Sequence, residues 1–86
     1  MRQLTLADIT QFLQKAIAEE TRIDIQKIDP SQSMGAFGLN SINSVYVLQQ
    51  LENFIDMELN PLLFWDYPTI NDLSQYLYQR MLQGHE

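Results

Sequence analysis

Gly38-Leu39-Asn40-Ser41-Ile42 is the stretch that joins a long irregular segment to a helix and leaves one hydroxyl group at the junction. Gly38 gives backbone freedom for a tight turn, and Asn40 is among the best helix N-cap residues. The pattern predicts a helix from about Ser41 to Phe54, with the Ser41 hydroxyl free at the positive end of the helix dipole. Such a position suits a covalently attached phosphate. Serine is itself a favoured cap, so this stretch taken alone also fits an ordinary helix start.

Two different faces of this predicted helix carry apolar residues. A single small core cannot easily bury both faces, and large exposed apolar clusters are uncommon on small soluble domains. The pattern therefore predicts one core face and one partner-binding face next to Ser41. The core face consists of Ser44, Val47, Leu48, Leu51 and Ile55, and the second face consists of Ile42, Val45, Tyr46 and Gln49.

The segments before Ser41 predict one helix and a long, pinned connection. Thr5 is expected to cap the first helix, with Asp8 completing a capping box, and this helix should end near Glu20-Thr21. From Arg22 to Asn40 no period is sustained, and a short strand at residues 23–25 is compatible with the pattern although no second strand pairs with it. The predicted inward face of the helix holds Ile9, Phe12, Leu13, Ala16 and Ile17, and the connection can be pinned by Ile23, Ile25, Ile28, Met34, Phe37 and Leu39.

The segments after the central helix predict a short third helix and a longer last one. Pro61 is expected at the first position of a helix that runs to Trp65, and Pro68 limits how far that helix extends. Thr69 should cap the last helix. The whole chain, residues 1–86, therefore reads as one all-α domain: a small four-helix bundle with a short third helix and a long loop between helices one and two. The last helix should place Ile70, Leu73, Leu77 and Met81 inward.

Composition excludes several classes of function. The chain has no Cys, and its one His, His85, lies in the tail, so thiolate or His-based metal sites and Ser/His triads are not expected. A net charge of −6 argues against a nucleic-acid partner, which would need clustered Lys and Arg. No signal peptide opens the chain, and no apolar run approaches membrane-spanning length. We expect a monomeric cytoplasmic protein that is not an enzyme and has no membrane partner.

With these residues in view, the chain resembles the acyl carrier protein family over nearly its full length. The family signature Gly-Leu-Asp-Ser-Leu stands here as Gly38-Leu39-Asn40-Ser41-Ile42. Upstream, Ile28-Asp29-Pro30 and Phe37-Gly38-Leu39 look like the family's loop. Downstream, residues 63–70, Leu-Phe-Trp-Asp-Tyr-Pro-Thr-Ile, are very similar to a run typical of polyketide-synthase carrier domains. Three blocks in order at the right spacing are a more specific signal than the pentapeptide alone.

The resemblance implies a 4′-phosphopantetheine arm attached to Ser41 through a phosphodiester by a transferase that uses coenzyme A and magnesium. Acyl or polyketide intermediates would be held as thioesters on the arm while acyl-loading and acyl-processing enzymes act on them. The resemblance also implies that those partners contact the helix beside Ser41. The implied partner-binding residues are Asn40, Ile42, Val45, Tyr46, Gln49 and Glu52.

The chain departs from the family pattern in ways that bear on its partners. Asn40 replaces the usual Asp and Ile42 the usual Leu, while Glu52 is the only acid between Ser41 and Phe54. Asn and Asp cap about equally well, so the helix start should survive, whereas recognition by a fatty-acid-type transferase should suffer. These features favour a broad-specificity transferase and a specialised polyketide or lipid pathway. The alternative is a carrier-like adaptor that binds protein partners without ever being modified.

Overall fold

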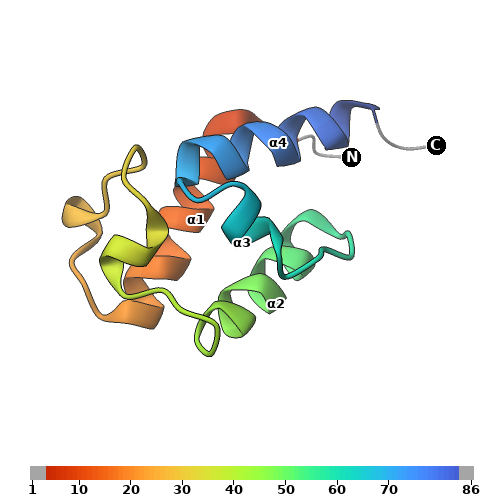
Figure 1. The fold of residues 1–86 in the computed structure, drawn as a ribbon. Coiled ribbons are helices and arrows are strands. Elements are labelled where there is room, and N and C mark those ends of the chain that lie inside the picture. Colours follow the sequence, from red (N-terminus) through yellow and green to blue (C-terminus); the bar gives the residue numbers. More distant parts are fainter. Residues whose placement is uncertain (1–3, 84–86) are drawn as a thin grey trace.

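The computed structural model describes residues 4–83, which form an all-helical bundle (Figure 1). The longer helices are α1 (Leu6–Thr21), α2 (Ser44–Ile55) and α4 (Ile70–Gln83), and the short α3 (Leu63–Asp66) lies between α2 and α4 in the chain. The connection from α1 to α2 contains two 3-10 turns, η1 (Ile25–Lys27) and η2 (Met34–Phe37). In this part of the chain there is no strand, only an isolated bridge between Ser33 and Thr69. The predicted four-helix architecture is confirmed.

The caps of the first and last helices are those that the sequence predicts. The Thr5 hydroxyl accepts a hydrogen bond from the Asp8 amide at 3.1 Å, and the Asp8 carboxylate accepts one from the Thr5 amide at 2.9 Å. This reciprocal pair is a capping box. At the start of α4, the Thr69 hydroxyl accepts from the Asp72 amide at 3.0 Å. Both helices thus begin where a side chain satisfies an otherwise unpaired backbone amide.

The core lies between α1, α2 and α4, because α1 packs against both of the other helices. The predicted core face of α2 is buried as a whole, which places the opposite face toward solvent. Phe12 of α1 and Phe54 of α2 stack in parallel with their ring centroids 4.1 Å apart. The fully enclosed aliphatic side chains include Ile9, Leu13 and Ile17 of α1, Val47 and Leu51 of α2, and Ile70, Leu73 and Leu77 of α4.

The long connection is fixed to the start of α4 by backbone hydrogen bonds. The Met34 amide donates to the Pro68 carbonyl at 2.7 Å, and the Asn71 amide donates to the Pro30 carbonyl at 3.0 Å. Buried side chains from the same connection complete the attachment, so the loop is pinned as predicted. These side chains are Ile28, Met34, Phe37 and Leu39.

The connection does not form the strand that its pattern allowed, and one of its residues was wrongly expected to pin it. Residues 23–25 form no strand, because the Asp24 carboxylate accepts a hydrogen bond from the Gln26 amide at 3.0 Å and thereby begins η1. Ile25 does not pin the loop to the core, since 44% of its side chain is exposed. The 3-10 turn rotates it away from the interior.

The predicted starts of the second and third helices are also wrong, by a few residues each. Regular α2 begins at Ser44 rather than Ser41, and α3 begins at Leu63 rather than Pro61. Before α3, the Asn60 side chain accepts a hydrogen bond from the Leu62 amide at 2.9 Å, so Pro61 lies in a turn closed by Asn60. His85 lies outside the described residues. None of the helices within residues 4–83 combines the length and apolar character needed to cross a membrane.

Candidate functional site

Residues 40–43, called here the Ser41 turn, are held by two asparagine side chains that cap each other. The Asn40 side-chain oxygen accepts hydrogen bonds from the amides of Ile42 at 2.8 Å and Asn43 at 3.0 Å. In return, the Asn43 side-chain oxygen accepts from the Asn40 amide at 2.7 Å. The Ser44 amide donates to the Asn40 carbonyl at 3.0 Å, so the turn leads directly into α2. Asn40 therefore performs the capping that the sequence predicts, although the regular helix begins later.

The segment before the turn is anchored by Gly38 and Leu39. Gly38 has a left-handed backbone with φ of 95°, a conformation that glycine adopts without strain. Its amide donates to the Gly35 carbonyl at 3.0 Å and closes η2, while its carbonyl accepts from the Asn43 side-chain amide at 3.0 Å. Leu39 is buried in the core. The Ser41 turn is thus fixed on its upstream side by both hydrogen bonds and apolar packing.

Ser41 is exposed at the tip of this arrangement. Within residues 4–83, neither its hydroxyl nor its backbone amide makes a hydrogen bond, whereas the neighbouring amides of Ile42 and Asn43 are satisfied by Asn40. The hydroxyl is accordingly neither a cap nor part of the bundle's internal bonding. An accessible, uncommitted oxygen on a rigid turn is what a covalently attached group requires, so the residues present fit such a group.

The Ser41 turn and the outer face of α2 that follows it carry exposed apolar side chains. The exposed fraction is 75% for Ile42, 49% for Val45 and 55% for Tyr46, and Gln49 lies on the same exposed side. The division of the helix into a core face and an outer face therefore agrees with the sequence pattern. Of the predicted partner-binding residues, Asn40 is exposed, but its side-chain oxygen is engaged within the turn.

Glu52, the last of those residues, has a structural contact of its own. Its side chain is half-buried, and its carboxylate accepts a hydrogen bond from the Leu59 amide at 2.8 Å. This bond holds the connection between α2 and α3 against the end of α2. Glu52 thus stabilises this connection from the side of α2 that also carries Val45 and Gln49.

Sequence reasoning did not single out two exposed residues of the α3 region. Leu62 is 61% exposed and Trp65 is 53% exposed. They lie three positions apart, so the turn that carries them points both side chains to the same side. A helix this short needs only one apolar side to pack against the core. Two further large apolar residues at helical spacing are therefore the sequence signal that could have found Leu62 and Trp65.

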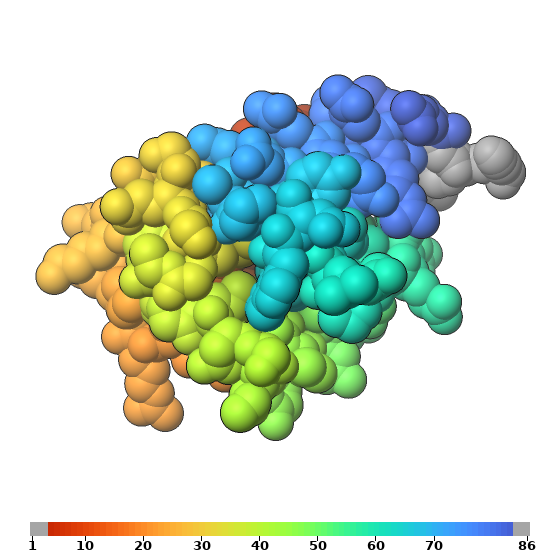
Figure 2. Space-filling model, in the orientation of Figure 1, coloured from red at the N-terminus to blue at the C-terminus, as the bar shows by residue number. Residues whose placement is uncertain are grey.

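A cleft of about 240 Å³ lies between η2 and α3. Leu39 and Trp65 both line it, so α3 meets the connection immediately upstream of Ser41. In the space-filling view the yellow connection, the yellow-green start of α2 and the cyan α3 adjoin on one face (Figure 2). The remaining lining residues are Ser33, Met34, Gly35, Phe64 and Pro68.

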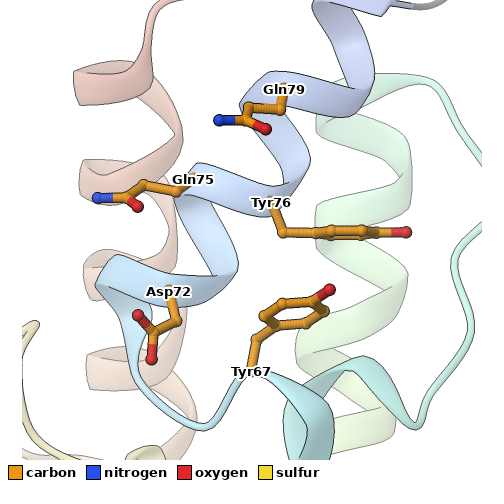
Figure 3. A pocket seen from close by; sticks show the side chains of 5 residues that line it. All are labelled: Tyr67, Asp72, Gln75, Tyr76 and Gln79. Carbon is orange, nitrogen blue, oxygen red and sulfur yellow. The ribbon is translucent and has the colours of Figure 1, made fainter.

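A larger hollow of about 440 Å³ lies on the outer side of α4 (Figure 3). Tyr67 and Tyr76 stack at its edge with ring centroids 4.5 Å apart, and Asp72, Gln75 and Gln79 line the rest. None of these residues belongs to the Ser41 turn. This hollow is therefore not part of the candidate site, although its volume is larger than that of the cleft beside η2.

Residues 11–77 match the family model described as "Phosphopantetheine attachment site". The chain belongs to this family. Its members hold phosphopantetheine covalently on a serine and act as carriers rather than catalysts. The matched span contains the Ser41 turn, α2 and α3, and α1 from Gln11 onward.

Two solved carrier proteins are similar to this chain in sequence and fold. It is 38% identical to a free-standing peptidyl carrier protein from an uncharacterized secondary metabolic pathway of Acinetobacter baumannii, with 88% of this chain and 95% of that chain covered and a TM-score of 0.84. It is 32% identical to an acyl carrier protein from Anabaena sp. PCC 7120 with a variant phosphopantetheinylation-site sequence. That match covers 92% of this chain and 90% of the other, with a TM-score of 0.80.

Among curated proteins, this carrier is similar to polyketide synthases. It is 28% identical over 75 residues to one of the phenolphthiocerol/phthiocerol polyketide synthase proteins of Mycobacterium tuberculosis. That match covers 87% of this chain but only 4% of the synthase, so the carrier corresponds to a small part of such a protein.

Proposed function

We propose that Ser41 is the attachment residue of this carrier and that the arm on it holds acyl intermediates as thioesters during polyketide biosynthesis. The observation that supports this most directly is the exposed, unbonded Ser41 hydroxyl on a capped turn inside the family match. In the transfer, the Ser41 oxygen bonds to the phosphorus next to the pantetheine, the pyrophosphate bond of coenzyme A breaks, and 3′,5′-ADP leaves with the hydroxyl proton taken up by a base. The arm's terminal thiol then supplies the group that forms the thioester.

The chain's own residues give this carrier its transferase preference. Asn40 keeps the capping geometry without placing a carboxylate beside Ser41. A transferase of the fatty-acid type that reads an acid at this position loses that contact, and a broad-specificity transferase does not depend on it. The variant attachment-site sequence of the Anabaena relative supports the view that carriers of this fold accept changes there.

The partner enzymes of the proposed carrier are acyl-loading and acyl-processing enzymes that approach along the outer side of α2. Asn40, Ile42, Val45, Tyr46, Gln49 and Glu52 are the residues proposed for this contact, with the exposed apolar three at its centre. We propose that the carrier works as a monomer in the cytoplasm.

Intact-mass measurement after incubation with coenzyme A and a broad-specificity transferase tests the attachment. The wild type should gain one phosphopantetheine, Ser41→Ala should gain none, and Ser31→Ala, another exposed serine of the same connection, should gain one. With a fatty-acid-type transferase, Asn40→Asp should be modified faster than the wild type. The absence of any gain with either transferase would refute the proposal and leave the exposed face as the surface of an unmodified adaptor.

A further inference from the structure

The dipeptide Asn-Ser occurs twice around the same turn, as Asn40-Ser41 and as Asn43-Ser44. The side chain of Asn is chemically labile, because the backbone nitrogen of the next residue can attack its amide carbon and close a succinimide ring. This attack requires a backbone nitrogen that is free to lose its proton and a side-chain amide that is free to leave. The structure meets these requirements at one pair and blocks them at the other.

At the second pair, the groups that would react are already hydrogen-bonded. The Ser44 amide donates to the Asn40 carbonyl at 3.0 Å. The Asn43 side chain is held at both of its polar atoms, since its oxygen accepts from the Asn40 amide at 2.7 Å and its nitrogen donates to the Gly38 carbonyl at 3.0 Å. Closing a ring at this half-buried residue would break the Ser44 and Gly38 bonds, so the fold protects Asn43.

At the first pair, the same groups are uncommitted. Within residues 4–83, neither the Ser41 amide nor the side-chain nitrogen of Asn40 makes a hydrogen bond, and both residues are exposed. The Asn40 side-chain oxygen, in contrast, accepts from two backbone amides at 2.8 and 3.0 Å. Negative charge develops on this oxygen when the amide carbon is attacked, and donors already in place stabilise such charge. The turn therefore favours attack on Asn40.

We propose that Asn40 is a site of spontaneous deamidation, selected by the fold over Asn43, and that the acid it yields changes which transferase loads Ser41. The Ser41 nitrogen loses its proton and bonds to Cγ of Asn40, the bond from Cγ to the side-chain nitrogen breaks, and ammonia leaves. Water then adds at Cγ, the bond to the Ser41 nitrogen breaks, that nitrogen regains a proton, and an aspartate results. Addition of water at the backbone carbonyl gives isoaspartate instead.

The aspartate product restores the residue that the family signature carries before its serine. Its carboxylate accepts the same two backbone hydrogen bonds as the Asn40 amide oxygen, so the turn is kept. The carrier thus gains with age the acid that a fatty-acid-type transferase reads. This second part of the inference rests on the proposed attachment at Ser41, whereas the deamidation itself does not.

Incubation of the folded protein in mildly alkaline buffer, followed by fragmentation mass spectrometry of its peptides, measures deamidation at each site. An amide that becomes an acid gains about 1 Da. Asn40 should convert at least about tenfold faster than Asn43, because only Asn43 must first lose its hydrogen bonds. In urea, where the chain is unfolded, the two identical dipeptides should convert at nearly equal rates.

Ser41→Pro is the matched control for the ring-closing route. Proline has no amide proton to lose, and it suits the position directly after a helix cap. This variant should therefore retain Asn40 under conditions in which the wild type converts it. Circular dichroism shows whether the variant keeps its helical fold.

Loading assays on fresh and aged protein test the consequence for the transferases. A fatty-acid-type transferase should load aged wild type faster than fresh wild type, in proportion to its aspartate fraction and up to the rate of Asn40→Asp. A broad-specificity transferase should load both at the same rate, because it does not depend on the acid.

The outcomes separate the two parts of the inference from the function. Equal conversion of Asn40 and Asn43 in the folded protein, or a preference that persists in urea, would overturn selection by the fold. Conversion of Asn40 at the wild-type rate in Ser41→Pro would overturn the ring-closing route. Isoaspartate as the sole product, or aged protein loaded no faster by the fatty-acid-type transferase, would overturn the second part. Absence of loading of fresh, aged and Asn40→Asp protein by either transferase would refute the attachment at Ser41 and leave the deamidation standing.

Discussion

Replacing Asn40 with Ala tests whether the side-chain cap fixes the Ser41 turn. The substitution removes the oxygen that accepts hydrogen bonds from the Ile42 and Asn43 amides at 2.8 and 3.0 Å. Because Asn40 is exposed, water can solvate the two freed amides, so the expected loss is about 1 kcal/mol, the usual value for an N-cap. For a domain of 86 residues this corresponds to a decrease in Tm of about 4–8 °C.

Asn40→Asp is the matched control, because a carboxylate oxygen accepts the same two hydrogen bonds. A negative charge near the start of α2 adds about 0.3–1 kcal/mol of stability, so this variant should melt at or above the wild-type temperature. Thermal unfolding followed by circular dichroism at pH 7 measures both variants. If Asn40→Ala melts within about 1 °C of the wild type, or if Asp destabilises as much as Ala, the side chain does not support the turn in the way argued.

Three further predictions concern the elements around the site. Leu51→Ala removes a fully buried side chain from α2 and should lower the free energy of unfolding in urea by about 2–5 kcal/mol, whereas an unchanged midpoint would contradict its central place in the core. Glu52→Ala should speed hydrogen exchange of the Leu59 amide, and Glu52→Gln, which keeps an acceptor oxygen, should not. Hydrogen bonds from the Ser31 amide and hydroxyl hold the pKa of Asp29 below its ordinary 3.8, so the turn they form is stable above that pH and should loosen as the pH falls through the lowered pKa. An NMR titration of the Ser31 amide that shows no change over this acid range would contradict it.

Much of the fold can be predicted from local patterns, because helix starts follow from capping residues and buried helix faces follow from the spacing of apolar residues. Thr5 and Thr69 cap their helices because a hydroxyl followed by an acid three residues later suits the first turn. The helical spacing of Val47 and Leu51 identifies the buried side of α2, and the apolar residues left over identify the exposed side. For the site, the same pattern locates the free hydroxyl and its neighbouring face.

The parts that sequence reasoning missed depend on side chains that form turns with nearby backbone. Asn43 does not look like a cap from its position, yet it bonds both the Asn40 amide and the Gly38 carbonyl and delays the start of regular α2. Asn60 likewise draws Pro61 into a turn ahead of α3. The exposure of Trp65 also depends on how α3 lies across the connection, which the spacing of Leu62 and Trp65 alone does not determine.

The backbone bonds that join the long connection to the start of α4 have a consequence for the order in which the molecule folds. Met34 and Pro30 are bonded to Pro68 and Asn71, which are made much later during synthesis. A nascent chain that lacks α4 therefore lacks the partners of these two backbone bonds, and closing so long a loop is less favourable until the last helix packs. We expect a transferase to find its serine properly presented only after the C-terminal helix has left the ribosome, which makes premature modification of an unfinished chain unfavourable.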